Sequence, residues 1–91
     1  NRFVDVAVQL QGRPVAAYQA AAIASGDELS AARKADLRAI ISRRQAVTRG
    51  RIVNLGGRVQ FAYTDVFNGF RIRVRANELQ AVAALSGVTN F

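Results

Sequence analysis

The side chains that could carry out chemistry in this chain are hydroxyls, six carboxylates and many guanidinium groups. Histidine and cysteine are both absent, which excludes thiol catalysis, disulfides, histidine-based triads and the common zinc sites within the chain. The carboxylates stand at expected turns and helix starts, as at Asp27, Glu28, Asp65 and Glu78, where turn formation and capping account for them. No spacing sets two carboxylates across a cleft, so we expect no catalytic residue, no metal site and no cofactor.

Guanidinium groups suggest binding instead. Arg71, Arg73 and Arg75 alternate with large apolar residues, so a strand would place all three arginines on one face. The formal net charge is +7, with twelve arginines and one lysine against six acids. This balance favours an acidic partner, which could be nucleic acid, anionic lipid or an acidic protein surface.

The stretch from 57 to 75, GRVQFAYTDVFNGFRIRVR, predicts two strands joined by a short turn. Alternation in its first arm predicts one face of Val59, Phe61 and Tyr63 and an opposite face of Arg58, Gln60 and Ala62. Asn68-Gly69 predicts a tight turn in which both residues adopt positive φ.

The rest of the chain supplies the elements that must position this hairpin. We expect a strand at Phe3–Leu10, a short helix at Val15–Ala24, a long helix from about Ser30 to Leu55, a second main helix at Asn77–Leu85, and the start of a last strand at Val88–Phe91. Ser30 or Asp27 can cap the long helix, Gly56-Gly57 should end it, and Asn77 can cap the second main helix with Gln80 in capping-box position.

The order of these elements predicts one α+β domain over residues 1–91, with a ferredoxin-like split βαβ arrangement (β-α-β-β-α-β). Its four-stranded antiparallel sheet would carry two helices on one face, plus a short helical insertion after the first strand. The expected core residues are Val4, Val6, Val8, Ile41, Ile52, Leu55, Val59, Phe61, Phe70, Ile72, Val74, Leu79, Val82 and Leu85.

An ordered set of residues carries a family resemblance. The pattern G-G-x-V-x-x-x-Y, then N-G-F, then E-L-x-x-x-x-x-L-x-G-V is similar to the propeptide domain of subtilisin-like serine proteases, a peptidase-inhibitor type of domain. The matching residues are Gly56, Gly57, Val59, Tyr63, Asn68, Gly69, Phe70, Glu78, Leu79, Leu85, Gly87 and Val88. The segment GRPVAAYQ resembles the insertion in the propeptides of large extracellular bacterial subtilases.

The resemblance implies an intramolecular chaperone and transient inhibitor that has no catalysis of its own. Its partner would be the cognate subtilisin-like catalytic domain of the same secreted precursor, and no nucleic acid or membrane would be involved. The open sheet face would dock on that domain, and a tail beyond residue 91 would block the active-site cleft. The chain begins without methionine and is therefore expected to be a piece of a longer protein, monomeric when isolated.

The candidate partner-binding residues share the sheet face opposite the helices or the turn beside it. They are Asp5, Ala7, Arg58, Gln60, Phe67, Arg71, Arg73 and Arg75. The same arginines could equally be a solvated face that keeps an exposed sheet soluble.

Two other functions fit the same predicted fold. An RNA-binding domain would use the basic face together with exposed aromatic residues, and burial of Phe70 under the helices would argue against it. Aromatic residues stacked on the arginine face would, in contrast, argue against the propeptide interpretation. The other alternative is a small-ligand or dimerisation module, which would form a stable sheet-edge homodimer.

Overall fold

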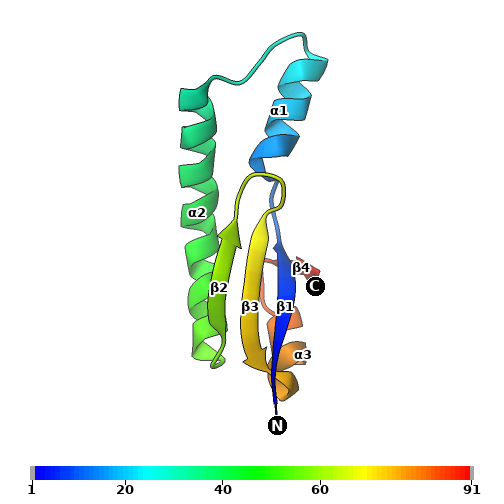
Figure 1. Cartoon of the computed structure of the whole chain (residues 1–91), viewed down its shortest axis with the longest axis vertical. Helices are drawn as coiled ribbons and strands as arrows, with labels where there is room; N and C mark the ends of the chain where they lie inside the picture. Colours follow the sequence, from blue (N-terminus) through cyan, green and yellow to red (C-terminus); the bar gives the residue numbers. More distant parts are fainter. Residues whose placement is uncertain (1, 91) are drawn as a thin grey trace.

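The computed structural model describes residues 2–90 and is an α+β domain, built from a four-stranded antiparallel sheet and three α-helices (Figure 1). The predicted α+β class and antiparallel sheet are therefore confirmed. In chain order the elements are β1 (Phe3–Leu10), α1 (Val15–Ala24), α2 (Ala31–Asn54), β2 (Arg58–Tyr63), β3 (Gly69–Arg75), a 3-10 turn (Ala76–Glu78), α3 (Leu79–Ala83) and β4 (Val88–Asn90).

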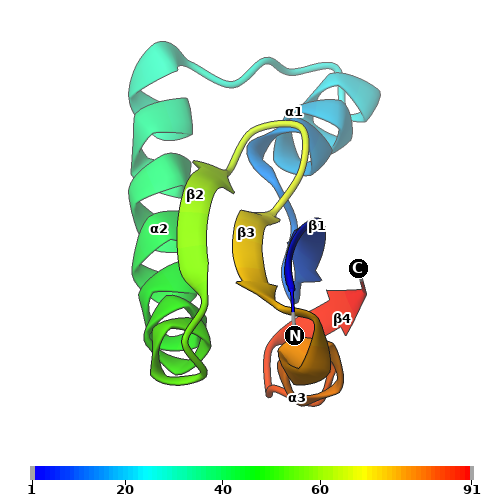
Figure 2. The same ribbon diagram turned by 60° about the horizontal axis from the view of Figure 1, so that its bottom comes forward.

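The strands lie in the order β2-β3-β1-β4, so β3 and β1 are central. Their pairing runs from Phe3 opposite Arg75 to Gln9 opposite Gly69. Strand β4 is short, and within the described residues it pairs with β1 at Gln9 and Leu10. In Figure 1 the strands lie in front and α3 lies behind them, and Figure 2 shows α2 alongside β2 and α3 below β3 and β1.

The main core lies between the sheet and these two helices. Alternate residues of β3 (Phe70, Ile72 and Val74) are fully buried, and they join Ile52 of α2 and Val82 of α3 in one cluster. The other members are Val8 and Leu10, with Val4, Val6, Leu55, Val59, Leu79, Leu85 and Val88 packed against them. Since successive residues of a strand point to opposite faces, the arginines between these buried residues lie on the other side of the sheet.

Helix α2 begins and ends where the sequence predicts. The side chain of Ser30 accepts a hydrogen bond from the backbone N–H of Arg33 at 3.0 Å, which is the expected N-cap. At the other end Gly56 adopts φ +81°, the left-handed conformation that terminates a helix. The helix continues through Gly50 without a break.

The domain is elongated because α2 runs past the end of the sheet. Its principal extents are 51 × 19 × 19 Å. Helix α1 lies beside this projecting half rather than over a sheet edge, and the two helices form a second, smaller cluster of Val15, Leu37 and Ile41, with Tyr18 and Leu29 packed against it (Figure 1). The predicted core residue Ile41 belongs to this second cluster.

A β-bulge in β2 makes part of the predicted alternation wrong. Val59 is opposite Ile72, but Phe61 is opposite Arg71, so Gln60 is an extra residue in the strand. One inserted residue moves every following side chain to the other face. Phe61, predicted to be in the core, is 58% exposed, and Tyr63, predicted to share its apolar face, is 37% exposed.

The predicted Asn68-Gly69 tight turn is also wrong. Neither residue has a positive φ, and the connection from β2 to β3 spans residues 64–68. Asn68 is buried and its side chain makes three hydrogen bonds to other segments, so tertiary contacts rather than turn type determine its conformation.

The second main helix is shorter than predicted. Residues Ala76–Glu78 form a 3-10 turn, and α3 covers only Leu79–Ala83. Asn77 therefore lies inside the turn and is not the N-cap. The 3-10 turn follows β3 directly with Arg75 at its N-cap position, and the backbone N–H of Ala76 donates to the carbonyl of Arg2.

Replacement of Phe70 should test this core. Phe70→Ala should lower the free energy of unfolding by about 3–5 kcal/mol, because it removes a fully buried ring from the centre of the sheet. Phe61→Ala is the matched control and should cost about 1 kcal/mol or less, since its ring is mostly exposed. Urea denaturation of both variants measures the difference, and equal losses would contradict the strand register of β2 against β3.

Candidate partner-binding surface

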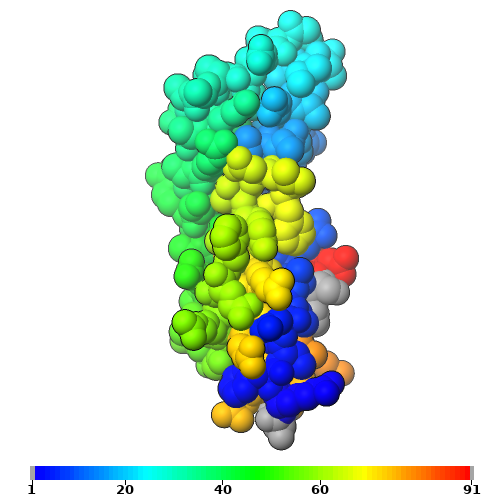
Figure 3. Space-filling model, viewed as in Figure 1, coloured from blue at the N-terminus to red at the C-terminus, as the bar shows by residue number. Residues whose placement is uncertain are grey.

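The face of the sheet opposite α2 and α3 is the candidate functional site. The strand register puts Asp5 opposite Arg73 and Ala7 opposite Arg71 on this face, which we call the open face. The first residue of β2, Arg58, is also opposite Arg73. Figure 3 shows side chains of β2, β3 and β1 sharing this surface, coloured green-yellow, gold and blue.

All eight predicted binding residues are located by the structure, but not in one uniform row. Six lie on the open face by register: Asp5, Ala7, Arg58, Arg71, Arg73 and Arg75. Gln60 is the exposed bulge residue, and Phe67 lies in the loop after β2, where it contacts Tyr63.

The arginines of the open face are only partly neutralised. Asp5 lies 3.5 Å from the Arg73 guanidinium, measured from Oδ1 to Nη1. Arg58 lies directly across the strand pair from Arg73, and like charges in that position destabilise a sheet. The Arg75 guanidinium is 4.9 Å from the ring centroid of Phe3, a cation–π distance. The open face therefore keeps an excess of positive charge.

A row of aromatic rings crosses the same face at its loop end, and the sequence interpretation missed it. The ring centroids of Phe61 and Tyr63 are 4.8 Å apart, and those of Tyr63 and Phe67 are 5.9 Å apart. The expectation of arginines without aromatic residues on this face was wrong, because the bulge at Gln60 turns Phe61 and Tyr63 outward. Strict alternation along RVQFAY gives no sign of an inserted residue.

Gly69 makes room for the end of this aromatic row. A Cβ on Gly69 would come within 2.5 Å of the Phe67 ring and would also collide with the carbonyl oxygen of Val8. Only glycine leaves that space empty, so the phenyl ring can lie back against the sheet beside Tyr63. The N-G-F sequence is therefore needed for close packing rather than for a positive φ.

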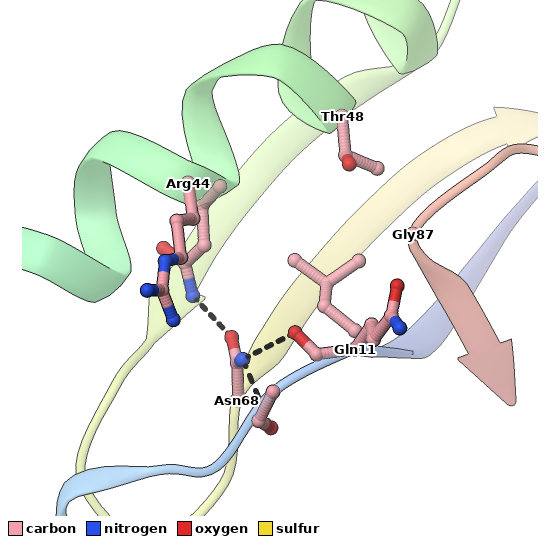
Figure 4. A pocket seen from close by; sticks show the side chains of 8 residues that line it. Gln11, Arg44, Thr48, Asn68 and Gly87 are labelled. Atoms are coloured by element: carbon pink, nitrogen blue, oxygen red, sulfur yellow. Dashed lines mark hydrogen bonds between the residues drawn. The ribbon is translucent and has the colours of Figure 1, made fainter.

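A buried pair of amides anchors the loop that carries Phe67 (Figure 4). The amide nitrogen of Gln45 in α2 donates to the Asn68 side-chain oxygen at 2.9 Å and to the Tyr63 carbonyl at 2.8 Å. The amide of Asn68 donates in turn to the carbonyls of Gln11 and Gly12. Both side chains are nearly inaccessible, at 4% and 7% exposure, so these bonds are made away from water.

This clamp of Gln45 and Asn68 borders a hollow of about 360 Å³ between α2 and the end of β1. Arg44, Thr48 and Gly87 also line it. The amide hydrogens of the clamp are already bonded within the domain. The other polar side chains that line the hollow are those of Gln11, Arg44 and Thr48.

A surface ion pair holds the same loop from outside. The Arg38 guanidinium donates to both carboxylate oxygens of Asp65, with Nε–Oδ1 and Nη2–Oδ2 distances of 2.9 Å. Hydrogen bonds from Arg38, and then from the Thr64 hydroxyl, lower the pKa of Asp65 below its ordinary value. The backbone N–H groups of Val15 and Ala16 also donate to the carbonyls of Thr64 and Asp65.

The described part of the chain contains no cluster of metal-ligating side chains. Among residues 2–90, no three histidine, cysteine, aspartate or glutamate side chains come together as a metal site. No described helix is both long and apolar enough to cross a bilayer.

Comparisons with known proteins do not identify a relative. No family model matches the chain, and no curated protein or solved structure matches it.

The Asp65 ion pair should make stability depend on pH in one direction. Because the pKa of Asp65 is lower in the folded state, the ion pair stabilises the fold above the unfolded pKa, and this stabilisation disappears as pH falls through the folded pKa. The effect should be small, since both side chains are about half exposed to solvent.

Asp65→Asn is the variant that measures how much this ion pair stabilises the fold. Wild type should be the more stable protein at about pH 6. The difference in melting temperature between wild type and variant should disappear as the pH falls through the lowered pKa of Asp65. Thermal melts across this range provide the comparison. A difference in melting temperature that widens as the pH falls would show that Asp65 does not act through this ion pair.

Proposed function

We propose that this domain is the propeptide of a subtilisin-like serine protease, which it helps to fold and then holds inactive by docking its open face on the catalytic domain. The observation that carries the proposal is a sheet buried on one side only, whose other side is open and carries arginines. The exposed rings beside them are tilted against one another at 40° and 62°, so they do not form the stacked aromatic surface that would argue against a propeptide. Aromatic residues and arginine are the residue types most enriched at the energetic centres of protein interfaces.

We further propose that the fold is of the ferredoxin-like split βαβ type, with α1 as an insertion after β1. The strand order β2-β3-β1-β4 and the placement of α2 and α3 against the same core cluster support this. The projecting helices α1 and α2 then extend a compact scaffold in the place where propeptides of large extracellular subtilases carry their insertion.

The residues behind the family resemblance have identifiable structural roles. Gly56 and Gly87 adopt positive φ, and a Cβ on Gly57 would come within 2.6 Å of the Ile52 side chain. Asn68 and Gly69 form the loop clamp and the seat of Phe67. The motif thus determines how the hairpin is attached to α2, and so shapes the face proposed to bind.

The proposed mechanism is binding without chemistry. A rigid open face presents a preformed surface on which part of a catalytic domain can fold, which lowers the entropic cost of bringing that part together. The arginines would increase the rate of encounter with an acidic surface and fix its orientation. The aromatic rings would supply most of the buried apolar area.

One observation favours a second candidate, which is binding of single-stranded nucleic acid. Exposed aromatic rings beside arginines on an open sheet can stack bases and hold phosphates. However, Phe70 and Ile72 of the central strand are fully buried, so β3 offers arginines where an RNA-recognition domain has stacking aromatic residues. The rings at Phe61 and Tyr63 belong to the edge strand instead.

Charge reversal on the open face should test the docking. The double change Arg71→Glu and Arg73→Glu should slow association with the catalytic domain encoded downstream in the same gene by about tenfold or more at low salt, because it removes electrostatic steering. Both side chains are exposed, so circular dichroism should show an intact fold. The matched control is the same reversal at Arg33 and Arg43 on α2.

Three results would contradict the proposal. The first is a gene that encodes no downstream domain with the aspartate, histidine and serine motifs of a subtilase. The second is unfolding of the double variant, which would assign these arginines to the scaffold. The third is micromolar or tighter binding of a single-stranded oligothymidine at physiological salt, lost on Phe61→Ser, which would favour the nucleic-acid function.

A further inference from the structure

The open face has a depression over Ala7, in the middle of β1. Hollows of about 120 Å³ and 210 Å³ lie on its two sides, and the Ala7 side chain lines both. Tyr63 and Arg71 border the first hollow, and Phe67 borders the second. Alanine is the smallest side chain that β1 presents to this face, and it lies between the two hollows.

The walls of this depression carry aromatic rings on one side and charged or polar groups on the other. Asp5 lines the first hollow beside Arg71, and Gln9 and Asn90 line the second. The rings of Tyr63 and Phe67 meet at an interplanar angle of 62°, so they form edges around a hollow rather than one flat platform for a base. Arg71 is directly opposite Ala7 on β3. Within the described part of the chain, Asp5 pairs with Arg73 and no carboxylate forms an ion pair with Arg71.

These features define the chemistry of an occupant. An apolar floor and aromatic edges suit one apolar side chain, and the guanidinium beside them suits a carboxylate on the same partner surface. A second copy of this chain would bring a face with the same excess of arginine and would be repelled. The complementary surface is therefore an acidic protein surface with a protruding apolar side chain.

We propose that the depression over Ala7 is the anchor site of the interface: it receives one apolar side chain of the partner, while Arg71 binds a neighbouring carboxylate. This inference rests on the proposed function and specifies the surface that the catalytic domain presents. It makes Ala7 a specificity-determining position, because any larger side chain there would fill the site.

Ala7→Ile tests the anchor without removing any contact of the free domain. Ala7 is exposed, and a β-branched residue suits a strand, so the fold should keep its stability. The probe is the catalytic domain encoded downstream, purified with its nucleophilic serine replaced by alanine, and the readout is the Kd from titration calorimetry. We expect Ala7→Ile to weaken binding by about tenfold or more, since it fills the anchor site.

Two controls make the result specific. Ala7→Ser keeps the depression and should bind within about twofold of wild type. Ala20→Ile makes the same chemical change at an exposed position of α1 and should also leave the Kd unchanged. Arg71→Gln should weaken binding and reduce its salt dependence, as expected for loss of an ion pair.

The outcomes separate the inference from the proposed function. Wild-type binding that is unaffected by Ala7→Ile overturns the anchor site alone. Equal losses for Ala7→Ile and Ala20→Ile also overturn it, because the effect would not be local. No binding by wild type overturns both the anchor site and the propeptide function.

Discussion

Burial of alternate residues along β3 is the constraint on which the other features of this domain depend. Phe70, Ile72 and Val74 are fully buried against Ile52 and Val82, and together they form most of the main core. A central strand that is apolar on one side can only direct its other side chains away from the helices. The arginine face is thus a geometric consequence of the core, and losing the core would lose the face.

The bulge at Gln60 gives the open face its second component. Without it, Phe61 and Tyr63 would turn towards α2, where Ala62 now lies opposite Phe70. The clamp of Gln45 and Asn68 then holds the following loop so that Phe67 continues the aromatic row. The bulge in the edge strand and the buried polar pair thereby add exposed aromatic rings to a charged surface. Bulges are often found where a side chain must be redirected for function.

The elements that could be predicted from the sequence are those with strong periodicity or an explicit end signal. Helix α2 has a serine cap and a terminal glycine, and β1 and β3 alternate without interruption. The side of the sheet on which Phe61 lies could not be predicted. The sequence of β2 fits regular alternation, so nothing in it marks Gln60 as an extra residue. The conformation of Asn68 could not be predicted either, because an Asn-Gly pair favours a tight turn locally. The hydrogen-bond partner that overrides this preference, Gln45, is 23 residues away in the sequence. The arginines of β3 were recognisable because their location depends only on which side of one strand is apolar.

The two apolar clusters have a consequence for how the domain opens. Along α2 the buried residues change from Leu37 and Ile41, beside α1, to Ile52, over the sheet, with polar Gln45 and Thr48 between them. Three buried side chains stabilise a region far less than the larger cluster does. One continuous helix should therefore show two rates of amide hydrogen exchange, fast in its first half and slow in its second. The projecting helices would then fray as a local unit while the sheet stays intact.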